Sequence, residues 1–316
     1  MNMMNAVRAH RRGGPEQLTY ETAPRPRPGP DEVLVAVRAA SVTAGELTWD
    51  ATWTDSFDGS GRDRTPTIPS HEFSGTVVAT GAAVTGRQAG DEVYGLVPFT
   101  RDGAAAEYVT LPADVSAGKP ASLTHDQAAA VPLAALTGRQ ALVDHARLRP
   151  GDRVLVHGGA GGVGSFVVQI AAALGARVAA TAGAADLEFV RSLGADTAID
   201  YANDRFEDRV SDADVIVDLV GGRTLRRSWD VLRPGGTLVG IAAPPDPQDA
   251  ERHQARGVFF VVRPDRAGLD AITRLVEDGR LTPAVDRVLP LSEARAAYEA
   301  LEREHRRGKI VLHVAD

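Results

Sequence analysis

The segment from Gly151 to Thr181, GDRVLVHGGAGGVGSFVVQIAAALGARVAAT, constrains the fold more than any other part of the chain. Residues 153–157 predict a short strand, residues 163–174 carry apolar side chains at helical spacing, and residues 177–181 predict a second strand. A strand, a helix and a parallel strand within about thirty residues form a βαβ unit. We therefore predict an α/β domain with a parallel sheet around this segment.

The loop between the first strand and the helix reads Gly158-Gly159-Ala160-Gly161-Gly162-Val163-Gly164. In a dinucleotide-binding loop one glycine permits a tight turn, one lets the backbone approach a pyrophosphate, and one lets the helix pack against the strand. We assign these roles to Gly159, Gly161 and Gly164. The N–H groups and dipole at the start of the helix stabilise phosphate charge. The predicted nucleotide contacts in this loop are Gly159, Ala160, Gly161, Gly162, Val163 and Gly164.

A chain of 316 residues exceeds the size that one hydrophobic core usually supports, so two domains are expected. Residues 4–122 contain short β-like runs broken by Gly and Pro, whereas strands and helices alternate after residue 123. The tail returns to a strand, a helix over 292–303 and a strand over 309–314. We predict a first domain over 1–123, a nucleotide-binding domain over 124–280, and a return to the first domain over 281–316.

Individual elements follow from the same patterns. Residues 124–130 predict a capped helix start, and residues 50–67 predict a mobile loop. The strands predicted in the first domain are 33–37, 73–79, 91–97 and 105–111. The elements predicted in the second domain are helices 133–148, 186–193 and 224–232 and strands 197–201, 214–220, 237–242 and 258–262.

Charge and composition exclude several classes of function. A net charge of −7 gives no electrostatic case for a nucleic-acid partner, and the absence of cysteine excludes disulfides, thiolate zinc sites and a cysteine nucleophile. The first ten residues lack the apolar core of a signal peptide. The apolar stretch 166–185 is interrupted by Gln169, Gly175 and Arg177, which argues against a membrane span. We expect a cytoplasmic protein with no membrane partner.

Seven segments together carry a family resemblance. They are 31–42 (DEVLVAVRAASV), 68–75 (IPSHEFSG), 90–95 (GDEVYG), 129–142 (AAVPLAALTGRQAL), the 158–164 loop, 218–222 (DLVGG) and 308–312 (GKIVL). In their order and spacing, nearly the whole chain resembles a zinc-independent medium-chain dehydrogenase/reductase of the quinone oxidoreductase type. The resemblance implies an α/β fold in which a GroES-like β domain carries an inserted Rossmann domain with a doubly wound parallel sheet. It also implies a homodimer, through edge pairing of residues 257–262.

The end of the second Rossmann strand distinguishes the two nicotinamide cofactors. An acid at this point binds the adenosine ribose, whereas a small or basic site accepts a 2′-phosphate. Thr181, Ala182 and Gly183 occupy this point, so the sequence favours NADPH over NADH. Asp186 lies a few residues later, and we interpret it as a helix N-cap rather than as the ribose acid.

The resemblance implies further cofactor contacts. It puts Gly183 and Tyr201 at the adenosine phosphate, although Tyr201 is equally explained as an edge aromatic residue. The contacts that it implies at the nicotinamide end are Thr137, Ile241, Ala242, Ala243, Pro244, Phe259, Phe260 and Val261. Phe259 and Phe260 also have an interpretation as core residues. Lys309 is either a contact to a cofactor phosphate or a solvated lysine.

His71 and Glu72 look like the ligand pair of zinc alcohol dehydrogenases. At the positions where those enzymes carry their other ligands, this chain has Thr43 and, approximately, Ala134. One imidazole cannot make a three-ligand catalytic site. We therefore expect no metal, and we interpret His71 as a hydrogen-bonded turn residue.

Without a metal, the chemistry expected is hydride transfer assisted by protein hydrogen bonds. When hydride adds to the β-carbon of an α,β-unsaturated ketone, charge builds on the carbonyl oxygen, which needs a hydrogen bond or a proton. Many members of the family read Asn-Pro-Val-Asp followed by a nearby Tyr, whereas this chain reads TAGE over 43–46 and has Thr48 at the tyrosine position.

The candidate catalytic residues follow from this difference. Thr43 is the first candidate to contact the nicotinamide or a substrate oxygen, with a plain turn residue as the alternative. Tyr108 is a weaker candidate donor. We expect Trp49 and Trp53 to wall a pocket for an aromatic or polycyclic small molecule, because they precede a charged loop, with packing in the core as the alternative.

We therefore expect an NADPH-dependent oxidoreductase that transfers hydride to a quinone or an α,β-unsaturated carbonyl compound without zinc. One alternative is a zinc-free ketone or alcohol dehydrogenase. Another is a protein that binds NADPH as a redox sensor or scaffold without turnover. Multiple turnovers with any acceptor would exclude the last alternative.

Overall fold

The computed structural model describes residues 2–56, 59–304 and 306–315, and the chain divides into two compact units. Unit 1 contains Met1–Leu133, Arg263–Glu277 and Pro283–Asp316, and unit 2 contains Ala134–Val262 and Asp278–Thr282. This division differs from the predicted domain over 124–280, because helix α8 (Arg266–Glu277) groups with unit 1. The Tyr94 hydroxyl lies 2.9 Å from the Leu269 carbonyl oxygen and 2.8 Å from Thr273 Oγ1, which ties α8 to the strands of unit 1.

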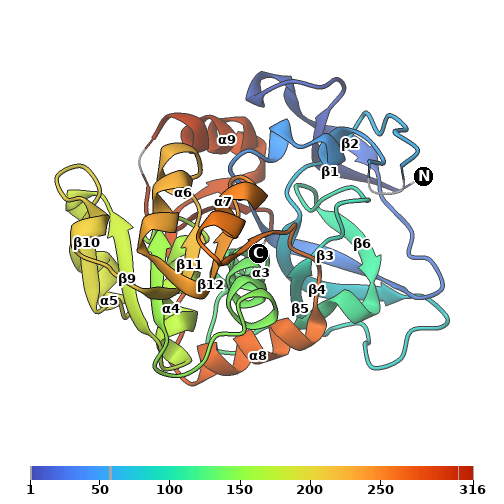
Figure 1. Cartoon of the computed structure of the whole chain (residues 1–316). Helices are drawn as coiled ribbons and strands as arrows, with labels where there is room; N and C mark the ends of the chain where they lie inside the picture. Colours follow the sequence, from blue (N-terminus) through green and yellow to red (C-terminus); the bar gives the residue numbers. More distant parts are fainter. Residues whose placement is uncertain (1, 57–58, 305, 316) are drawn as a thin grey trace. The chain divides into compact units, whose positions relative to one another are not determined.

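Unit 2 is built on a six-stranded parallel sheet in the order β10-β9-β8-β11-β12-β13. The strands are β8 (Arg153–His157), β9 (Arg177–Ala182), β10 (Thr197–Asp200), β11 (Ala213–Asp218), β12 (Leu232–Gly240) and β13 (Arg256–Phe259). In chain order this is 3-2-1-4-5-6, the Rossmann arrangement. The predicted doubly wound parallel sheet is therefore confirmed, and β9, β11 and β12 are seen within it in Figure 1.

The α-helices that follow strands of this sheet in the chain are α4 (Gly164–Ala173), α5 (Leu187–Ser192), α6 (Gly222–Ser228) and α7 (Pro247–Arg252). Another helix, α3 (Pro132–Arg139), precedes β8 in the chain. The prediction of a single α-helix over 133–148 was wrong for its second half, because the α-helix ends at Arg139 and Gln140–His145 is π-helical. The Ala146 N–H bonds to the carbonyl of Ala141, five residues back, as this wider helix requires.

Burial explains why α4 is apolar on nearly every face. Every residue from Gly164 to Ala171 is buried, so this helix has no solvent face to carry charges. The sheet beside it contributes Leu155, Ile199, Ile216 and Leu238 to one hydrophobic cluster. In the described residues, no helix combines the length and the apolar character needed to cross a membrane.

Unit 1 contains a seven-stranded sheet in the order β14-β15-β3-β4-β5-β7, with β6 also paired to β3, and a separate β1–β2 hairpin. The strands are β1 (Met3–Ala9), β2 (Leu18–Pro24), β3 (Glu32–Ser41), β4 (Glu72–Thr80), β5 (Glu92–Leu96), β6 (Tyr108–Pro112), β7 (Ser116–Gly118), β14 (Val285–Pro290) and β15 (Lys309–His313). β15 pairs antiparallel with β3, with Val311 opposite Ser41. The C-terminal tail thus completes the first sheet, as the sequence predicts.

The helices of unit 1 include two that the sequence predicts and two that it does not. They are α1 (Asp50–Trp53), α2 (His125–Ala129), α8 and α9 (Ala294–Arg303, red in Figure 1). Thr124 caps α2 in a capping box with Gln127, which confirms the predicted helix start. The segment 50–67, predicted as a mobile loop, contains the helix α1 and a Thr54–Asp63 bridge, so it is not a loop throughout. Residues 57 and 58 of that prediction lie outside the described residues.

Candidate functional site

The 158–164 loop connects β8 to α4 at the point in the sheet where β8 and β11 are neighbours. Connections leave the sheet in opposite directions there, and ligands of open α/β sheets bind at this point. Gly158 has φ of +79°, so it makes the tight turn that we assigned to Gly159. Gly159 is required for another reason, because a Cβ there would lie 2.9 Å from Ala180 Cβ.

Gly161 and Gly164 differ in what surrounds them. A Cβ on Gly164 would lie 2.0 Å from the Gly158 carbonyl oxygen, so the start of α4 packs directly on the turn, as predicted. A Cβ on Gly161 would meet only the Gly158 oxygen, at 3.5 Å. Gly161, Gly162 and Val163 are partly exposed, while Ala160 is buried. The accessible backbone at the N-terminus of α4 therefore suits an anionic group.

A buried hydrogen-bond chain lies beneath this loop. Thr181 Oγ1 accepts from the Gly158 N–H at 3.2 Å and lies 3.3 Å from His157 Nδ1. His157 Nε2 lies 3.0 Å from Ser228 Oγ, which donates to the Thr224 carbonyl oxygen at 2.8 Å. Burial lowers the pKa of His157 to about 4, so its ring is neutral at pH 7. With Thr181 donating to Nδ1 and Nε2–H donating to Ser228, every member of the chain has a partner.

The end of β9 carries no acidic side chain. Thr181 and Ala182 are buried, Gly183 is partly exposed, and the Tyr201 N–H bonds to the Ala182 carbonyl oxygen at 3.2 Å. Tyr201 follows β10 and is 64% exposed, so it is not the strand residue that the pattern predicts. Asp186 stands at the N-cap position of α5, which confirms the interpreted position, although its side chain makes no capping hydrogen bond there.

The remaining predicted cofactor residues of unit 2 follow strands or lie on α3. Thr137 is buried on α3, and the 241–243 segment follows β12, with the Ile241 N–H bonded to the Asp218 carbonyl oxygen. Phe259 and Val261 are about half exposed, which rules out the core interpretation of Phe259. Phe260 is partly buried, and its ring centre lies 4.3 Å from that of His145.

In unit 1, Thr43 lies against a buried ion pair. Lys309 Nζ lies 2.5 Å from Glu72 Oε1 and donates to the Val42 carbonyl oxygen at 3.0 Å and to Thr43 Oγ1 at 3.2 Å. The side chain of Lys309 is buried, with Glu72 as its ion-pair partner and two oxygen atoms as hydrogen-bond acceptors. The interpretation of Lys309 as a solvated lysine is therefore wrong, and its contact to a cofactor phosphate stays a prediction. Burial raises the pKa of Glu72, and Lys309 opposes that rise.

A second buried cluster of unit 1 contains Glu46, His71 and Tyr298. Glu46 Oε1 accepts from the Ser70 N–H at 2.8 Å and from His71 Nδ1 at 2.9 Å, and Oε2 accepts from the Tyr298 hydroxyl at 2.7 Å. Burial, reinforced by Glu46, raises the pKa of Tyr298 well above its usual value, so the phenol stays protonated. His71 is thus a hydrogen-bonded residue at the start of β4, in accord with the sequence interpretation.

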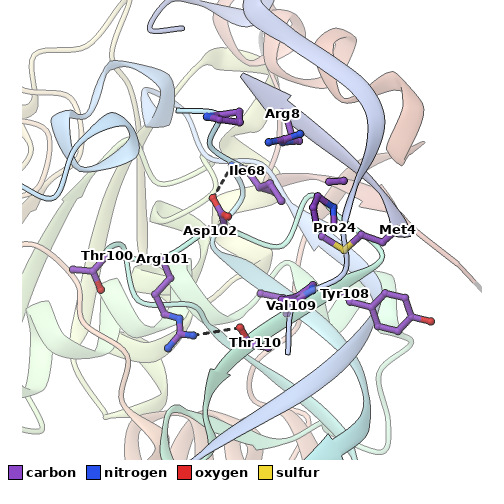
Figure 2. Close-up of a pocket in the computed structure, with 14 residues that line it drawn as sticks. Met4, Arg8, Pro24, Ile68, Thr100, Arg101, Asp102, Tyr108, Val109 and Thr110 are labelled. Atoms are coloured by element: carbon purple, nitrogen blue, oxygen red, sulfur yellow. Dashed lines mark hydrogen bonds between the residues drawn. The ribbon is translucent and has the colours of Figure 1, made fainter. Parts of the chain in front are cut away.

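The aromatic candidates do not share one site. Trp53 is buried, donates from Nε1 to the Leu47 carbonyl oxygen and belongs to a hydrophobic cluster, so the prediction of a pocket wall was wrong for Trp53. Trp49 is partly exposed and packs edge-on against Phe99. Tyr108 lies beneath the Arg25 guanidinium and lines a separate cavity of about 580 Å³ with Met4, Ile68 and Arg101 (Figure 2). Neither Thr43 nor Trp49 lines that cavity.

Comparison with known proteins assigns the family. Residues 29–121 match the profile described as "Alcohol dehydrogenase GroES-like domain", and residues 193–312 match "Zinc-binding dehydrogenase". The chain is 33% identical over 316 residues to a probable zinc-binding oxidoreductase of Arthroderma benhamiae, covering 94% of this chain and 93% of that protein. The chain belongs to the quinone oxidoreductase-like medium-chain dehydrogenases/reductases.

Two further relatives of this quinone oxidoreductase-like chain are informative. The structure of the quinone oxidoreductase from Coxiella burnetii superposes with a TM-score of 0.90 at 30% identity, covering 99% of this chain and all of that one. An NADPH-dependent alkenal/one oxidoreductase of Arabidopsis thaliana is 36% identical over 258 residues, which are 78% of this chain and 64% of that protein. The medium-chain dehydrogenase/reductase assignment also makes the chain an enzyme of that superfamily.

One matching family profile is described as zinc-binding. The side chains of this quinone oxidoreductase-like chain can therefore be compared with those that a zinc ion requires. His71 Nδ1 faces the Glu46 carboxylate and Nε2 lies 3.3 Å from the Arg101 carbonyl oxygen, so both ring nitrogens already have protein partners. Glu72 is paired with Lys309, and the chain has no cysteine. Across 2–56, 59–304 and 306–315, no three His, Cys, Asp or Glu side chains gather to hold a metal. These residues do not fit a zinc site.

Sequence reasoning missed several residues of this quinone oxidoreductase-like fold that the geometry brings out. They are Glu46, His157, Ser228 and Tyr298. His157 could have been found from the sequence, because a histidine that ends an otherwise apolar buried strand needs hydrogen-bond partners for its ring. Nothing in the sequence around Tyr298 indicates its role, because its partner Glu46 lies 252 positions away in the chain.

Proposed function

We propose that this chain is an NADPH-dependent oxidoreductase that transfers hydride to a quinone or an α,β-unsaturated carbonyl compound without zinc. The observation that carries the proposal is the 158–164 loop, whose backbone at Gly161 is open while Gly164 seats α4 directly behind it. The relatives support the acceptor classes, since one is named a quinone oxidoreductase and another an alkenal/one oxidoreductase.

NADPH is proposed over NADH because the end of β9 offers Thr181, Ala182 and Gly183, with no carboxylate to bind a ribose hydroxyl pair. The exposed Tyr201 beside Ala182 supports a contact to the adenosine phosphate. When bound, the reduced nicotinamide supplies the hydride. The chain's own residues would bind the pyrophosphate at Gly161, Gly162 and Val163, with Gly158 held by Thr181 beneath them.

The zinc-free part of the proposal rests on the donor set of unit 1. Both nitrogens of His71 face oxygen atoms, and the carboxylate of Glu72 is neutralised by a lysine ammonium. A protein hydrogen bond must therefore stabilise the charge that develops on the acceptor oxygen.

The test is anaerobic NADPH oxidation, followed by absorbance, with an aromatic quinone and a simple enone as parallel acceptors and NADH as the control. We expect turnover with at least one acceptor, a preference for NADPH, and no loss of rate after treatment with a chelator. The Gly161→Asp variant should lose nucleotide binding, because it puts a negative side chain where the pyrophosphate is proposed. Loss of activity on chelation, restored by zinc, would reject the zinc-free mechanism.

Absence of turnover with every acceptor, together with intact NADPH binding, would reject the reductase proposal in favour of a sensor or scaffold. Reduction of a ketone but not of the enone or quinone would favour the ketone or alcohol dehydrogenase alternative. These outcomes are separated by product analysis of the same reactions.

We also propose a homodimer and a cytoplasmic location. β13 is one of the two edge strands of the sheet of unit 2, and the exposed Phe259 at its end and Val261 just after it support pairing with a second copy. Light scattering after size-exclusion chromatography tests the dimer, with Val261→Lys as the variant expected to shift the mass to that of a monomer.

A further inference from the structure

Gly158 is the residue of the 158–164 loop on which the positions of the other glycines depend. Its carbonyl oxygen accepts from the Gly161 N–H at 3.1 Å, and the same oxygen lies 2.0 Å from the place of a Cβ on Gly164. With φ of +79°, Gly158 has a conformation that only glycine adopts readily, and a glycine backbone is ordered only where other contacts hold it. The contacts of Gly158 therefore decide where the backbone of Gly161 and the start of α4 lie.

Thr181, near the end of β9, holds this turn by two hydrogen bonds. Its side-chain Oγ1 accepts from the Gly158 N–H at 3.2 Å, and its carbonyl oxygen accepts from the Gly159 N–H at 2.9 Å. The second bond joins backbone groups and is available to any residue at position 181. The first bond needs a side-chain oxygen, so it depends on the residue type at this position.

The hydrogens of the chain from Thr181 through His157 to Ser228 can be assigned, because this chain ends on a carbonyl group. The Thr224 carbonyl oxygen only accepts, so the single hydrogen of Ser228 Oγ is committed to it at 2.8 Å. The 3.0 Å contact between Ser228 Oγ and His157 Nε2 is then donated by Nε2–H. The ring is neutral at pH 7 and has no second hydrogen, so Nδ1 accepts from the Thr181 hydroxyl at 3.3 Å. The hydroxyl hydrogen of Thr181 thus points to His157, which leaves its lone pairs for the Gly158 N–H.

The side chains of this hydrogen-bond chain are too deeply buried to contact a nucleotide themselves. His157 and Ser228 are 0% exposed, and Thr181 is 4% exposed. The Phe206 ring packs against the His157 ring, with 4.7 Å between the ring centres. Gly161, in contrast, is partly exposed. Any effect of the buried side chains on nucleotide binding must therefore act through the backbone of the loop.

We propose that His157 is a positioning residue for the pyrophosphate of the nicotinamide cofactor. Its Nδ1 takes the hydrogen of the Thr181 hydroxyl and so keeps Thr181 Oγ1 as the acceptor for the Gly158 N–H, while Ser228 on α6 fixes the imidazole ring. The loop then has its binding shape before the cofactor binds, which lowers the cost of ordering it. The inference rests on the nucleotide site of the proposed function and is independent of which acceptor is reduced.

The first test changes Thr181 and measures the Kd for NADPH by calorimetric titration. Thr181→Val keeps the shape of the side chain but removes the acceptor for Gly158, whereas Thr181→Ser keeps the hydroxyl. We expect Thr181→Val to raise the Kd about tenfold and Thr181→Ser to change it by less than about twofold. Thr237→Val is the matched control, because Thr237 is a buried threonine of β12 whose hydroxyl faces Arg256 instead of the loop. Its Kd should equal that of the unmodified protein.

The second test separates the two hydrogen bonds of the His157 ring. An asparagine amide reaches the place of Nδ1 and a glutamine amide the place of Nε2, and each amide both accepts and donates. His157→Asn therefore keeps an acceptor for Thr181, whereas His157→Gln keeps the donor to Ser228 and leaves Thr181 without its acceptor. We expect the Kd for NADPH to rise about tenfold in His157→Gln and less than about threefold in His157→Asn. Urea unfolding should show similar losses of stability in both variants, since each loses one hydrogen bond of the buried chain.

The outcomes separate this inference from the proposed function. Failure of the unmodified protein to bind NADPH or NADH would overturn both. Binding of NADPH without turnover of any acceptor would overturn the reductase proposal alone, because the Kd comparisons need no turnover. Equal Kd values for Thr181→Val and the unmodified protein, or for His157→Asn and His157→Gln, would overturn the positioning role of His157.

Discussion

The hydroxyl of Tyr298 lies 2.7 Å from Glu46 Oε2, although 252 positions separate the two residues in the chain. Both side chains are buried, and Glu46 also receives hydrogen bonds from the Ser70 N–H and the His71 ring. A helix of the C-terminal tail, α9, is thereby fixed to the 43–49 segment that carries Thr43. This contact shows that α9, in the C-terminal tail, supports the segment that carries the candidate residue Thr43.

Tyr298→Phe should destabilise the protein by about 1–3 kcal/mol, because it leaves one oxygen of a buried carboxylate without its donor. Urea unfolding measures this loss. Tyr20→Phe is the control, since Tyr20 is 45% exposed and its change should stay within about 0.5 kcal/mol. Equal midpoints for the two variants would contradict the importance of the Glu46 contact.

His157 should make stability depend on pH. Its pKa is about 4 in the folded protein, where burial is the main cause and Arg227 lowers it further while Glu207 opposes this, against about 6.5 in an unfolded chain. The stabilisation is therefore complete above about pH 6.5 and is lost as the pH falls towards 4, by about 3 kcal/mol in total. His157→Gln should flatten this part of the pH dependence of unfolding. The same substitution at the exposed His10 is the control.

Alanine at Gly164 should mainly lower the free energy of unfolding, whereas alanine at Gly161 should mainly weaken NADPH binding. Gly164→Ala places a methyl group 2.0 Å from the Gly158 carbonyl oxygen and should cost about 3 kcal/mol in unfolding free energy. Gly161→Ala meets its nearest atom at 3.5 Å, so it should change stability by less than about 0.5 kcal/mol while weakening NADPH binding. Denaturant unfolding and calorimetric titration with NADPH give the two readouts. A strongly destabilised Gly161→Ala would argue against an open loop.

Trp53→Ala should cost about 3–5 kcal/mol of stability, since the side chain is buried in the core cluster of unit 1. Trp49→Ala should cost about 1 kcal/mol or less because Trp49 is partly exposed. Thermal unfolding of the two variants decides the assignment. Similar losses would mean that Trp49 is also a core residue.

The elements that could be predicted from the sequence are those marked by a repeating pattern of apolar residues or by a position that requires a particular residue type. The βαβ unit around Gly161 and the capping box at Thr124 depend on residues within one short window, and both are present. α8 also carries a local signal in its sequence, because apolar Leu269, Ile272 and Val276 recur at helical spacing and are buried on one face.

The candidate site was less predictable because its contacts join distant segments. Nothing near Lys309 in the chain indicates that its ammonium pairs with Glu72 and holds Thr43, since the strand β15 brings it there by pairing with β3. Composition alone suggested a solvated lysine, which is the ordinary state of this residue. Trp53 was misassigned for the same reason, because its Leu47 partner and its core neighbours come from several segments.

The pairing of β15 with β3 also sets an order of events during synthesis. The ribosome releases the carboxylates of Glu46 and Glu72 long before Tyr298 and Lys309, which complete their surroundings. All strands of the sheet of unit 2 emerge in between and need no partner from the tail, so that sheet can form first. In unit 1, by contrast, Glu46 and Glu72 obtain the partners Tyr298 and Lys309 only after α9 and β15 have been synthesised, so the surroundings of both carboxylates are completed by residues made late in translation.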